Sequence, residues 1–462
     1  MSSIKVTEYK TSKDKMMRAS ANPDAPKLYI ETYGCQMNVS DSEVVNSIMI
    51  ENGFALTDTI DNADVIFINT CAVRDNAEQR IRNRLQALNA LKKKRKGLII
   101  GMLGCMAERL KEQLVQEEQI LDIVAGPDAY RTLPQLVKQA ETGQKAVNVL
   151  LSREETYAEI SPVRKDANNV TAFVSITRGC DNMCAFCVVP FTRGRERSRN
   201  PESILREVRE VISEGYKEVT LLGQNVDKYN WNNGEVNFAK LLRMTAEIDS
   251  TVRVRFSTSY PQDFTDEVIK TMAEYDNICK YIHLPVQSGS NIMLEKMKRG
   301  YTREWYLDRI KTVRKHIPDC AISTDMISGF CGETEEDHKD TLRLMEEVGY
   351  DFAYMFMYSE RPNTYAARNF EDDIDEETKK RRLNEVIALQ QKLSLKSNKK
   401  DVGKVFEVLV EGNSKKSNDR LFGRNSQNKV IVFDKKDANV GDYVKVKVNS
   451  CTSATLLGEI LK

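Results

Sequence analysis

The sequence predicts an α/β protein in three parts: an N-terminal domain with a parallel sheet, a central partial (β/α)6 barrel and a small C-terminal antiparallel β-barrel. Three observations support this architecture. Apolar strands alternate with helical segments in the first third of the chain, six further strand-and-helix units follow, and short alternating runs separated by Gly, Asn and Asp come after residue 402. The length of 462 residues agrees with about three domains.

The composition is that of a globular, intracellular protein. Apolar residues make up 41% of the chain and charged residues 30%. No apolar run approaches the ~18 residues of a membrane helix, and no apolar signal region follows the N-terminus. Ten cysteines in a chain of this size favour reduced thiols and metal ligation over disulfides. We therefore expect a cytoplasmic protein that does not enter a membrane.

The N-terminal part combines a polar arm with a regular βα pattern. Residues 1–25 lack periodicity, so we expect a mobile arm. Residues 26–143 form the first domain, and Ser40 or Asp41 is the expected N-cap of its first helix. The expected strands are 27–32, 65–69, 98–103 and 123–125, and the expected helices are 41–51, 76–94, 106–116 and 133–143. This alternation predicts a mainly parallel sheet.

A cysteine follows each of three successive strands in this domain: Cys35, Cys71 and Cys105, here called the strand-end cysteines. The carboxyl ends of parallel strands lie on one edge of a sheet, where ligands bind. We therefore expect the three thiols to converge and to hold a metal cluster. The alternative is three buried thiols, because free cysteine is a common core residue.

Residues 144–165 are an expected linker, and residues 166–396 form the central domain with a second group of cysteines. Its expected strands are 171–177, 218–222, 252–257, 281–285, 321–327 and 352–358. Cys180, Cys184 and Cys187, here called the loop cysteines, follow the first strand at CxxxCxxC spacing. Three thiolates leave one iron of a four-iron cluster open to a substrate. A zinc knuckle is less favoured because no fourth ligand follows at knuckle distance, and a disulfide loop is the other alternative.

The C-terminal part, residues 397–462, is the small β-barrel, preceded by a charged helical connector over 372–400. Residues 396–462 contain 14 Lys and Arg against 8 Asp and Glu, a net charge of +6 within a chain of net charge +1. A basic small barrel favours a grip on phosphates of nucleic acid. A solvated, lysine-rich face is the alternative.

A second basic cluster, Arg193, Arg195, Arg197 and Arg199, follows the loop cysteines. Arginines at the mouth of the barrel could hold RNA phosphates. Equally, some could pair with Glu196 and Glu202 and brace the loop.

The order of these parts resembles the methylthiotransferase family of the radical S-adenosylmethionine superfamily, whose C-terminal module is the TRAM domain. The resemblance covers about residues 27–462. The motif around Cys35 is similar to the branch that modifies tRNA rather than the branches that modify ribosomal protein or threonylcarbamoyl-adenosine. The matching motifs are Thr32-Tyr-Gly-Cys-Gln-Met-Asn38, Ile68-Asn-Thr-Cys-Ala-Val-Arg74, Gly101-Met-Leu-Gly-Cys105 and Cys187-Val-Val-Pro-Phe-Thr-Arg-Gly-Arg-Glu196.

The resemblance implies a radical enzyme with two [4Fe-4S] clusters that uses two molecules of S-adenosylmethionine per turnover. The strand-end cysteines would hold an auxiliary cluster that carries sulfur, and the loop cysteines would hold the cluster that cleaves S-adenosylmethionine. The substrate would be N6-isopentenyladenosine beside the anticodon in a tRNA anticodon stem-loop, which gains sulfur and methyl at C2. The expected partners are a reductant protein and a sulfur donor, and we expect a monomer.

Polar residues at the barrel strand ends are the expected S-adenosylmethionine ligands, with hydrogen bonding of the barrel rim as the alternative. The resemblance places Phe186 near the adenine. The remaining candidates are Gly223, Gln224, Asn225, Ser257, Gln287 and Asp325.

Two other functions remain open. The first is an enzyme with the same clusters that modifies a protein, which the motif around Cys35 disfavours. The second is an RNA-binding iron–sulfur sensor without catalysis.

Overall fold

The computed structural model describes residues 12–71, 75–165, 170–415 and 417–461. The chain forms two compact units. The first contains Met1–Asp166, Phe173–Asp181 and Val188–Glu210, and the second contains Ala167–Ala172, Asn182–Cys187 and Val211–Lys462. The segment 188–210, expected in the central domain, therefore groups with the N-terminal sheet, as does the expected linker.

The first unit is built on a six-stranded sheet with the order β2-β1-β3-β4-β5-β6, in which every pairing is parallel. Its strands are β1 Lys27–Thr32, β2 Ala55–Leu56, β3 Val65–Thr70, β4 Ile99–Gly104, β5 Ile123–Ala125 and β6 Ala146–Asn148. β3 and β4 are buried at every position, as expected for central strands covered on both faces. The predicted parallel sheet is confirmed, and the short strands β2 and β6 at its edges were not predicted.

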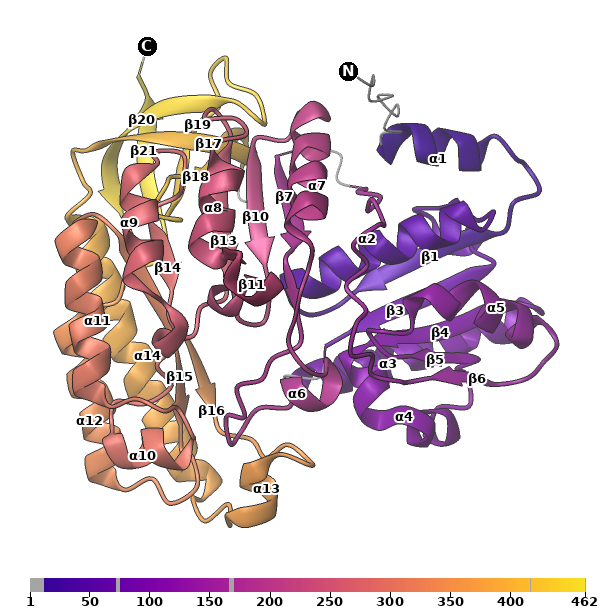
Figure 1. Ribbon diagram of the computed structural model, residues 1–462, viewed down its shortest axis with the longest axis horizontal. Helices are drawn as coiled ribbons and strands as arrows, with labels where there is room; N and C mark the ends of the chain where they lie inside the picture. The colour runs from indigo at the N-terminus through magenta and orange to yellow at the C-terminus, as the bar shows by residue number, and fades with distance from the viewer. Residues whose placement is uncertain (1–11, 72–74, 166–169, 416, 462) are drawn as a thin grey trace. The chain divides into compact units, whose positions relative to one another are not determined.

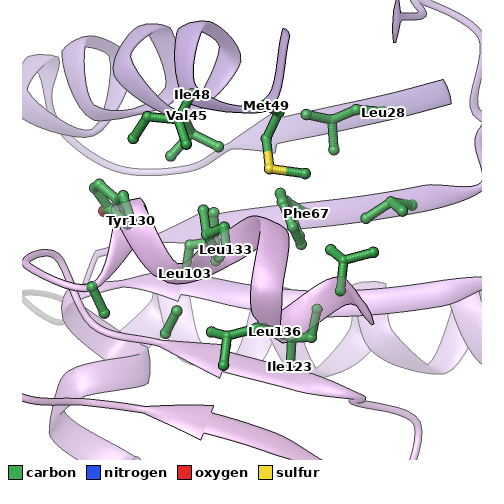
Figure 2. Packing of buried hydrophobic residues seen from close by; sticks show 14 of the residues in the cluster. Leu28, Val45, Ile48, Met49, Phe67, Leu103, Ile123, Tyr130, Leu133 and Leu136 are labelled. Atoms are coloured by element: carbon green, nitrogen blue, oxygen red, sulfur yellow. The ribbon is translucent and has the colours of Figure 1, made fainter. Parts of the chain in front are cut away.

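Helices cover both faces of this sheet (Figure 1). On one face lie α2 (Gln36–Glu51) and α5 (Leu133–Glu141), and on the other lie α3 (Asp75–Lys94) and α4 (Cys105–Glu117). Figure 2 shows the first of these two cores, with side chains of α2, α5 and the strands in one apolar layer. Its labelled members are Leu28, Val45, Ile48, Met49, Phe67, Leu103, Ile123, Tyr130, Leu133 and Leu136.

Two expectations for the N-terminal part are wrong. The polar arm contains a helix, α1 (Ser12–Ser20), anchored where Lys15 Nζ donates to the Ser161 carbonyl at 2.9 Å; residues 1–11 lie outside the described residues. Helix α2 begins at Gln36 with Cys35 as its N-cap, so Ser40 and Asp41 are buried inside the helix and do not cap it. Asp41 instead forms buried ion pairs with Arg178 and Arg193.

The six predicted strands of the central domain are all present. They form two sheets with the orders β13-β10-β7 and β14-β15-β16, in which β10 and β13, β14 and β15, and β15 and β16 pair in parallel. The strands are β7 Thr171–Ser175, β10 Glu218–Leu222, β13 Arg253–Ser257, β14 Tyr281–His283, β15 Ala321–Ser328 and β16 Phe352–Met357. β7 begins in the second unit and continues into the first.

Helices separate the strands of the central domain. Their bounds are α6 Val189–Thr192, α7 Pro201–Ser213, α8 Phe238–Ala246, α9 Asp266–Glu274, α10 Asn291–Lys296, α11 Arg303–His316, α12 Glu335–Val348, α13 Tyr365–Asn369 and α14 Glu376–Lys399. The last of these is the expected charged connector. None of the described helices is long and apolar enough to cross a membrane.

The C-terminal barrel is closed, with the order β17-β18-β19-β21-β20. Its strands are β17 Val405–Ser414, β18 Ser417–Arg424, β19 Val430–Asp434, β20 Tyr443–Cys451 and β21 Leu456–Ile460. The barrel is not entirely antiparallel, because β19 and β21 pair in parallel. Two arginines of β13 bind this barrel. Arg253 donates to the carbonyls of Glu407 and Arg424, and Arg255 donates to those of Asn425 and Ser426.

Candidate metal centre

The strand-end cysteines lie along one edge of the first unit's sheet. Cys35 follows β1, Cys71 follows β3 and Cys105 opens α4 directly after β4. Since β1, β3 and β4 are neighbours in the sheet, the predicted common edge is confirmed. A hydrogen bond with Cys71 lowers the pKa of the Cys35 thiol. Burial opposes this shift, and the nearby charge of Arg193 reinforces it. The two thiols therefore interact, and the thiolate form that binds metal becomes more accessible at Cys35.

The backbone beside Cys35 leaves room for Cys71. Gly34 has φ +125°, and a Cβ on it would lie 2.5 Å from the Cys71 Cβ. Behind these residues, Asn38 and Asn69 form a reciprocal pair. Asn38 Nδ2 donates to Asn69 Oδ1 at 3.1 Å, and Asn69 Nδ2 donates to the Asn38 carbonyl at 2.9 Å. These buried bonds tie the start of α2 to the end of β3 and so fix the two cysteines relative to each other.

A buried charge network adjoins the third thiol. Arg193 Nε donates to Cys105 Sγ at 3.2 Å, and Arg193 Nη2 donates to Asp41 Oδ2 at 2.8 Å. Arg178 Nη1 donates to the other oxygen of Asp41, also at 2.8 Å. Burial alone would raise the pKa of Asp41, but the charges of Arg178 and Arg193 outweigh it and lower the pKa. The carboxylate therefore stays ionised and compensates the charge of the arginine that contacts Cys105.

The donor set of this edge fits an iron–sulfur cluster. Among the described residues, no three His, Cys, Asp or Glu side chains form a group that could hold one metal ion. A cubane presents a separate iron to each thiolate, so its ligands surround a body and need not meet at one point. Three neighbouring soft donors with an arginine beside one of them suit such a body.

In the second unit, the segment with Cys184 and Cys187 is held by packing and by backbone hydrogen bonds. The Ala185 amide donates to the Met297 carbonyl at 2.9 Å, and the Ala185 carbonyl accepts from the Ala366 amide at 2.8 Å. Ala185 is fully buried in a cluster with Met293, Met297 and Phe330, and Phe186 packs against that cluster. Cys184 is thereby fixed next to Arg299, whose Nη1 donates to Cys184 Sγ at 3.1 Å. Cys180 belongs to the first unit, where its amide donates to the Gly194 carbonyl.

Rim hydrogen bonding is present among the expected S-adenosylmethionine ligands. The Gly223 amide donates to the Ser257 carbonyl at 3.1 Å, Asn225 Nδ2 donates to Asp263 at 2.7 Å, and the Gln287 amide donates to the Asp325 carbonyl at 3.0 Å.

Two of these candidates also carry a polar atom that is left over for a ligand. Gln224 Oε1 and Asn225 Oδ1 are buried and have no hydrogen-bond partner within the described part of the chain. A bound polar cofactor would satisfy them, so these two remain the best supported of the candidates.

Three of the four arginines expected near RNA are buried in the first unit. Arg193 pairs with Asp41, Arg197 with Asp128, and Arg199 with Glu207. Their burial favours the bracing alternative, although their partners are not Glu196 and Glu202, which were expected. Arg195 differs, because its side chain is 76% exposed and it pairs only loosely with Asp181 at 3.5 Å. A contact with RNA phosphates stays a prediction for Arg195.

The sequence reasoning missed the residues that support the thiols. The sequence pattern indicates only a helix cap for Asp41 and no role for Arg178 or Arg299. Arg299 contacts Cys184 directly, whereas Asp41 and Arg178 act on Cys105 through Arg193. None of the three lies at a regular sequence spacing from its cysteine. Their sequence neighbours include Ser40, Thr177 and Lys298, so no apolar surroundings mark them in the sequence as buried charges.

Three family models match successive parts of the chain. The description "Uncharacterized protein family UPF0004" matches residues 27–126, "Radical SAM superfamily" matches residues 174–345, and "TRAM domain" matches residues 399–461. These matches confirm the predicted order of the three parts.

Close relatives match over nearly the whole chain. A protein of Amoebophilus asiaticus named tRNA-2-methylthio-N(6)-dimethylallyladenosine synthase is 59% identical over 94% of this chain and 92% of its own length. One of Bacteroides thetaiotaomicron with the same name is 56% identical over 96% of this chain and 98% of its own.

The fold is also similar to that of TsrM from Kitasatospora setae, a radical S-adenosylmethionine methyltransferase solved with cobalamin and a [4Fe-4S] cluster. The TM-score is 0.58 at 14% identity, over 74% of this chain and 77% of that one.

Proposed function

Because the chain belongs to the family of tRNA-2-methylthio-N(6)-dimethylallyladenosine synthases, we propose that it inserts sulfur and methyl at C2 of N6-isopentenyladenosine next to the anticodon of tRNA. The observation that carries this proposal is the meeting of three strand-end thiols at one sheet edge, in a chain that also has a CxxxCxxC loop. Two separate sets of three thiols are what a reaction with two [4Fe-4S] clusters needs.

The protein's contribution is to hold and tune the cofactors. When bound, the clusters and S-adenosylmethionine supply the radical and the sulfur that an unreactive aromatic C–H bond requires. Cys35, Cys71 and Cys105 hold the auxiliary cluster, and Cys180, Cys184 and Cys187 hold the other. The remaining candidates orient S-adenosylmethionine through strand-end polar groups, among which the leftover oxygens of Gln224 and Asn225 are the strongest.

The RNA is held by the basic C-terminal barrel and by Arg195. The barrel's net positive charge suits phosphate binding, and the hydrogen bonds from Arg253 and Arg255 fix it to β13 within the second unit. We further propose a cytoplasmic monomer that takes electrons from a reductant protein and replacement sulfur from a sulfur donor.

The test supplies the anaerobically reconstituted full chain with a reductant, S-adenosylmethionine and an isopentenylated anticodon stem-loop RNA. We expect 5′-deoxyadenosine to be released and the RNA to gain the mass of a methylthio group. The same RNA without the isopentenyl group is the matched control. Release of 5′-deoxyadenosine with no mass gain on RNA would favour a protein substrate, whereas salt-sensitive RNA binding without any 5′-deoxyadenosine would favour a sensor.

A further inference from the structure

Arg299 is held tightly against one loop cysteine. Its side chain is 4% exposed and donates from all three nitrogens: Nη1 to Cys184 Sγ at 3.1 Å, Nη2 to the Pro285 carbonyl at 2.7 Å and Nε to the Tyr301 hydroxyl at 3.0 Å. The guanidinium carbon lies 4.4 Å from the ring centre of Tyr260 and 5.5 Å from that of Tyr301. A guanidinium with every nitrogen engaged has little freedom to turn away from the sulfur.

The surroundings of Arg299 leave its charge uncompensated. In the described part of the chain, its hydrogen-bond and charge partners are a carbonyl, two tyrosines and the Cys184 thiol, with no carboxylate among them. Arg193 of the first unit, which also contacts a cysteine sulfur, by contrast has a carboxylate partner in Asp41, which it shares with Arg178. A buried cation without a counter-ion is costly, so it calls for a negative partner in the working protein.

We propose that Arg299 is a positioning residue that orients the Cys184 thiolate and favours the reduced state of the cluster held by the loop cysteines. The inference rests on the proposed function in one respect, namely that these cysteines hold a [4Fe-4S] cluster. Reduction adds one electron from a low-potential one-electron donor, with no proton and no bond made or broken. The added negative charge lies beside a fixed cation in a poorly solvated site, which stabilises the reduced form.

The same arrangement predicts an asymmetry between the two cysteine sites. A carboxylate beside an arginine weakens the arginine's field, so Arg193, which is paired with Asp41, should raise the potential of the strand-end cluster less than Arg299 raises that of the loop cluster. Arg299 has no carboxylate among its hydrogen-bond partners, so the field of its charge at Cys184 is not weakened in this way. In the proposed reaction, the cluster of the loop cysteines must be reduced in every turnover. This is also the cluster that has Arg299, a cation without a carboxylate partner, beside one of its cysteines, Cys184.

The test is a redox titration followed by electron paramagnetic resonance, with the reconstituted full chain as reference. Variants in which alanine replaces the three strand-end cysteines isolate the signal of the loop cluster. In that background we compare Arg299→Gln and Arg299→Lys, with Arg193→Gln measured in the holoenzyme as the matched control. At the wild-type midpoint, we expect Arg299→Gln to lower the ratio of reduced to oxidised cluster about tenfold, equivalent to about 59 mV for one electron. Arg299→Lys should restore part of this shift because it keeps the charge.

The outcomes separate the proposal from its alternatives. An unchanged midpoint in an Arg299→Gln protein that retains about four irons overturns it. An unchanged midpoint with weakened binding of S-adenosylmethionine assigns Arg299 to the cofactor instead and also overturns it. Should Arg299→Gln fail to retain iron, Arg299→Met decides the matter, because it also removes the charge while filling more of the space, and a midpoint equal to wild type overturns the proposal. A reference protein without a cluster at the loop cysteines would instead refute the proposed function.

Discussion

The two cysteine sites are built by opposite means. The strand-end cysteines are far apart in sequence and are brought together by three neighbouring parallel strands. The loop cysteines span eight positions, so the short covalent connection keeps them close. The first arrangement depends on the whole sheet and on the network around Asp41, while the second depends on local packing around Ala185. The first site should therefore be sensitive to changes in the fold, and the second to changes within its own loop.

The largest effect is expected from removing each set of thiols in turn. Alanine at all three strand-end cysteines should lower the iron content from about eight to about four per chain, assuming two clusters of four. Cleavage of S-adenosylmethionine should survive and methylthiolation should be lost. Replacing Cys184 and Cys187 should abolish both activities. Iron assay and chromatography of 5′-deoxyadenosine measure these losses, and loss of cleavage in the strand-end variant would contradict the separation of roles.

Asp41→Asn tests the dependence of the first site on its charge network. The substitution leaves Arg178 and Arg193 buried without their shared carboxylate, which should lower the free energy of unfolding by about 3–5 kcal/mol. Urea denaturation of the full chain without metal measures this change. The control is Asp58→Asn, which breaks an exposed pair with Lys165 and should cost at most about 1 kcal/mol. Equal effects of the two substitutions would show that the network does not support the sheet edge.

Gly34→Ala tests whether the space beside Cys71 matters separately from backbone strain. The control is Gly53→Ala. Both glycines have positive φ, +125° at Gly34 and +90° at Gly53, but of these two positions only Gly34 would bring a Cβ against another residue, at 2.5 Å from the Cys71 Cβ. Each alanine should cost about 1–3 kcal/mol of backbone strain. Only Gly34→Ala should also lower the iron content below that of wild type. A normal iron content in that variant would mean that the edge adjusts freely.

The smallest effect concerns Glu108, one turn after Cys105 in α4. Its side chain is fully buried, and burial raises the pKa of its carboxyl to about 7. Because this pKa is higher in the folded than in the unfolded chain, the stability linked to Glu108 is complete below about pH 4.5 and is lost as pH rises through 7. At pH 8, Glu108→Gln should stabilise the protein by roughly 1–2 kcal/mol, with no gain at pH 4.5. Urea denaturation at both pH values measures this, and an equal gain at the two values would contradict it.

The sequence was sufficient to predict the parallel sheet, the six central strands and the edge shared by the strand-end cysteines. These features follow from hydrophobic periodicity and from the rule that parallel strands end on one side. It was insufficient for α1, which depends on a distant contact of Lys15 with Ser161, and for the parallel pairing of β19 with β21. It also missed Arg299, because a partner 115 positions away from Cys184 leaves no local pattern.

The hydrogen bonds from Arg253 and Arg255 to the C-terminal barrel bear on which substitutions the barrel tolerates. Four of their hydrogen bonds end on main-chain carbonyls, at Glu407, Arg424, Asn425 and Ser426. Main-chain carbonyl oxygens are present whatever the side chain. Surface side chains of the barrel can therefore be substituted one by one while its hydrogen bonds to Arg253 and Arg255 are kept. Exchange of the whole module for another barrel with the same backbone path should therefore give a chimera that docks normally but prefers a different RNA.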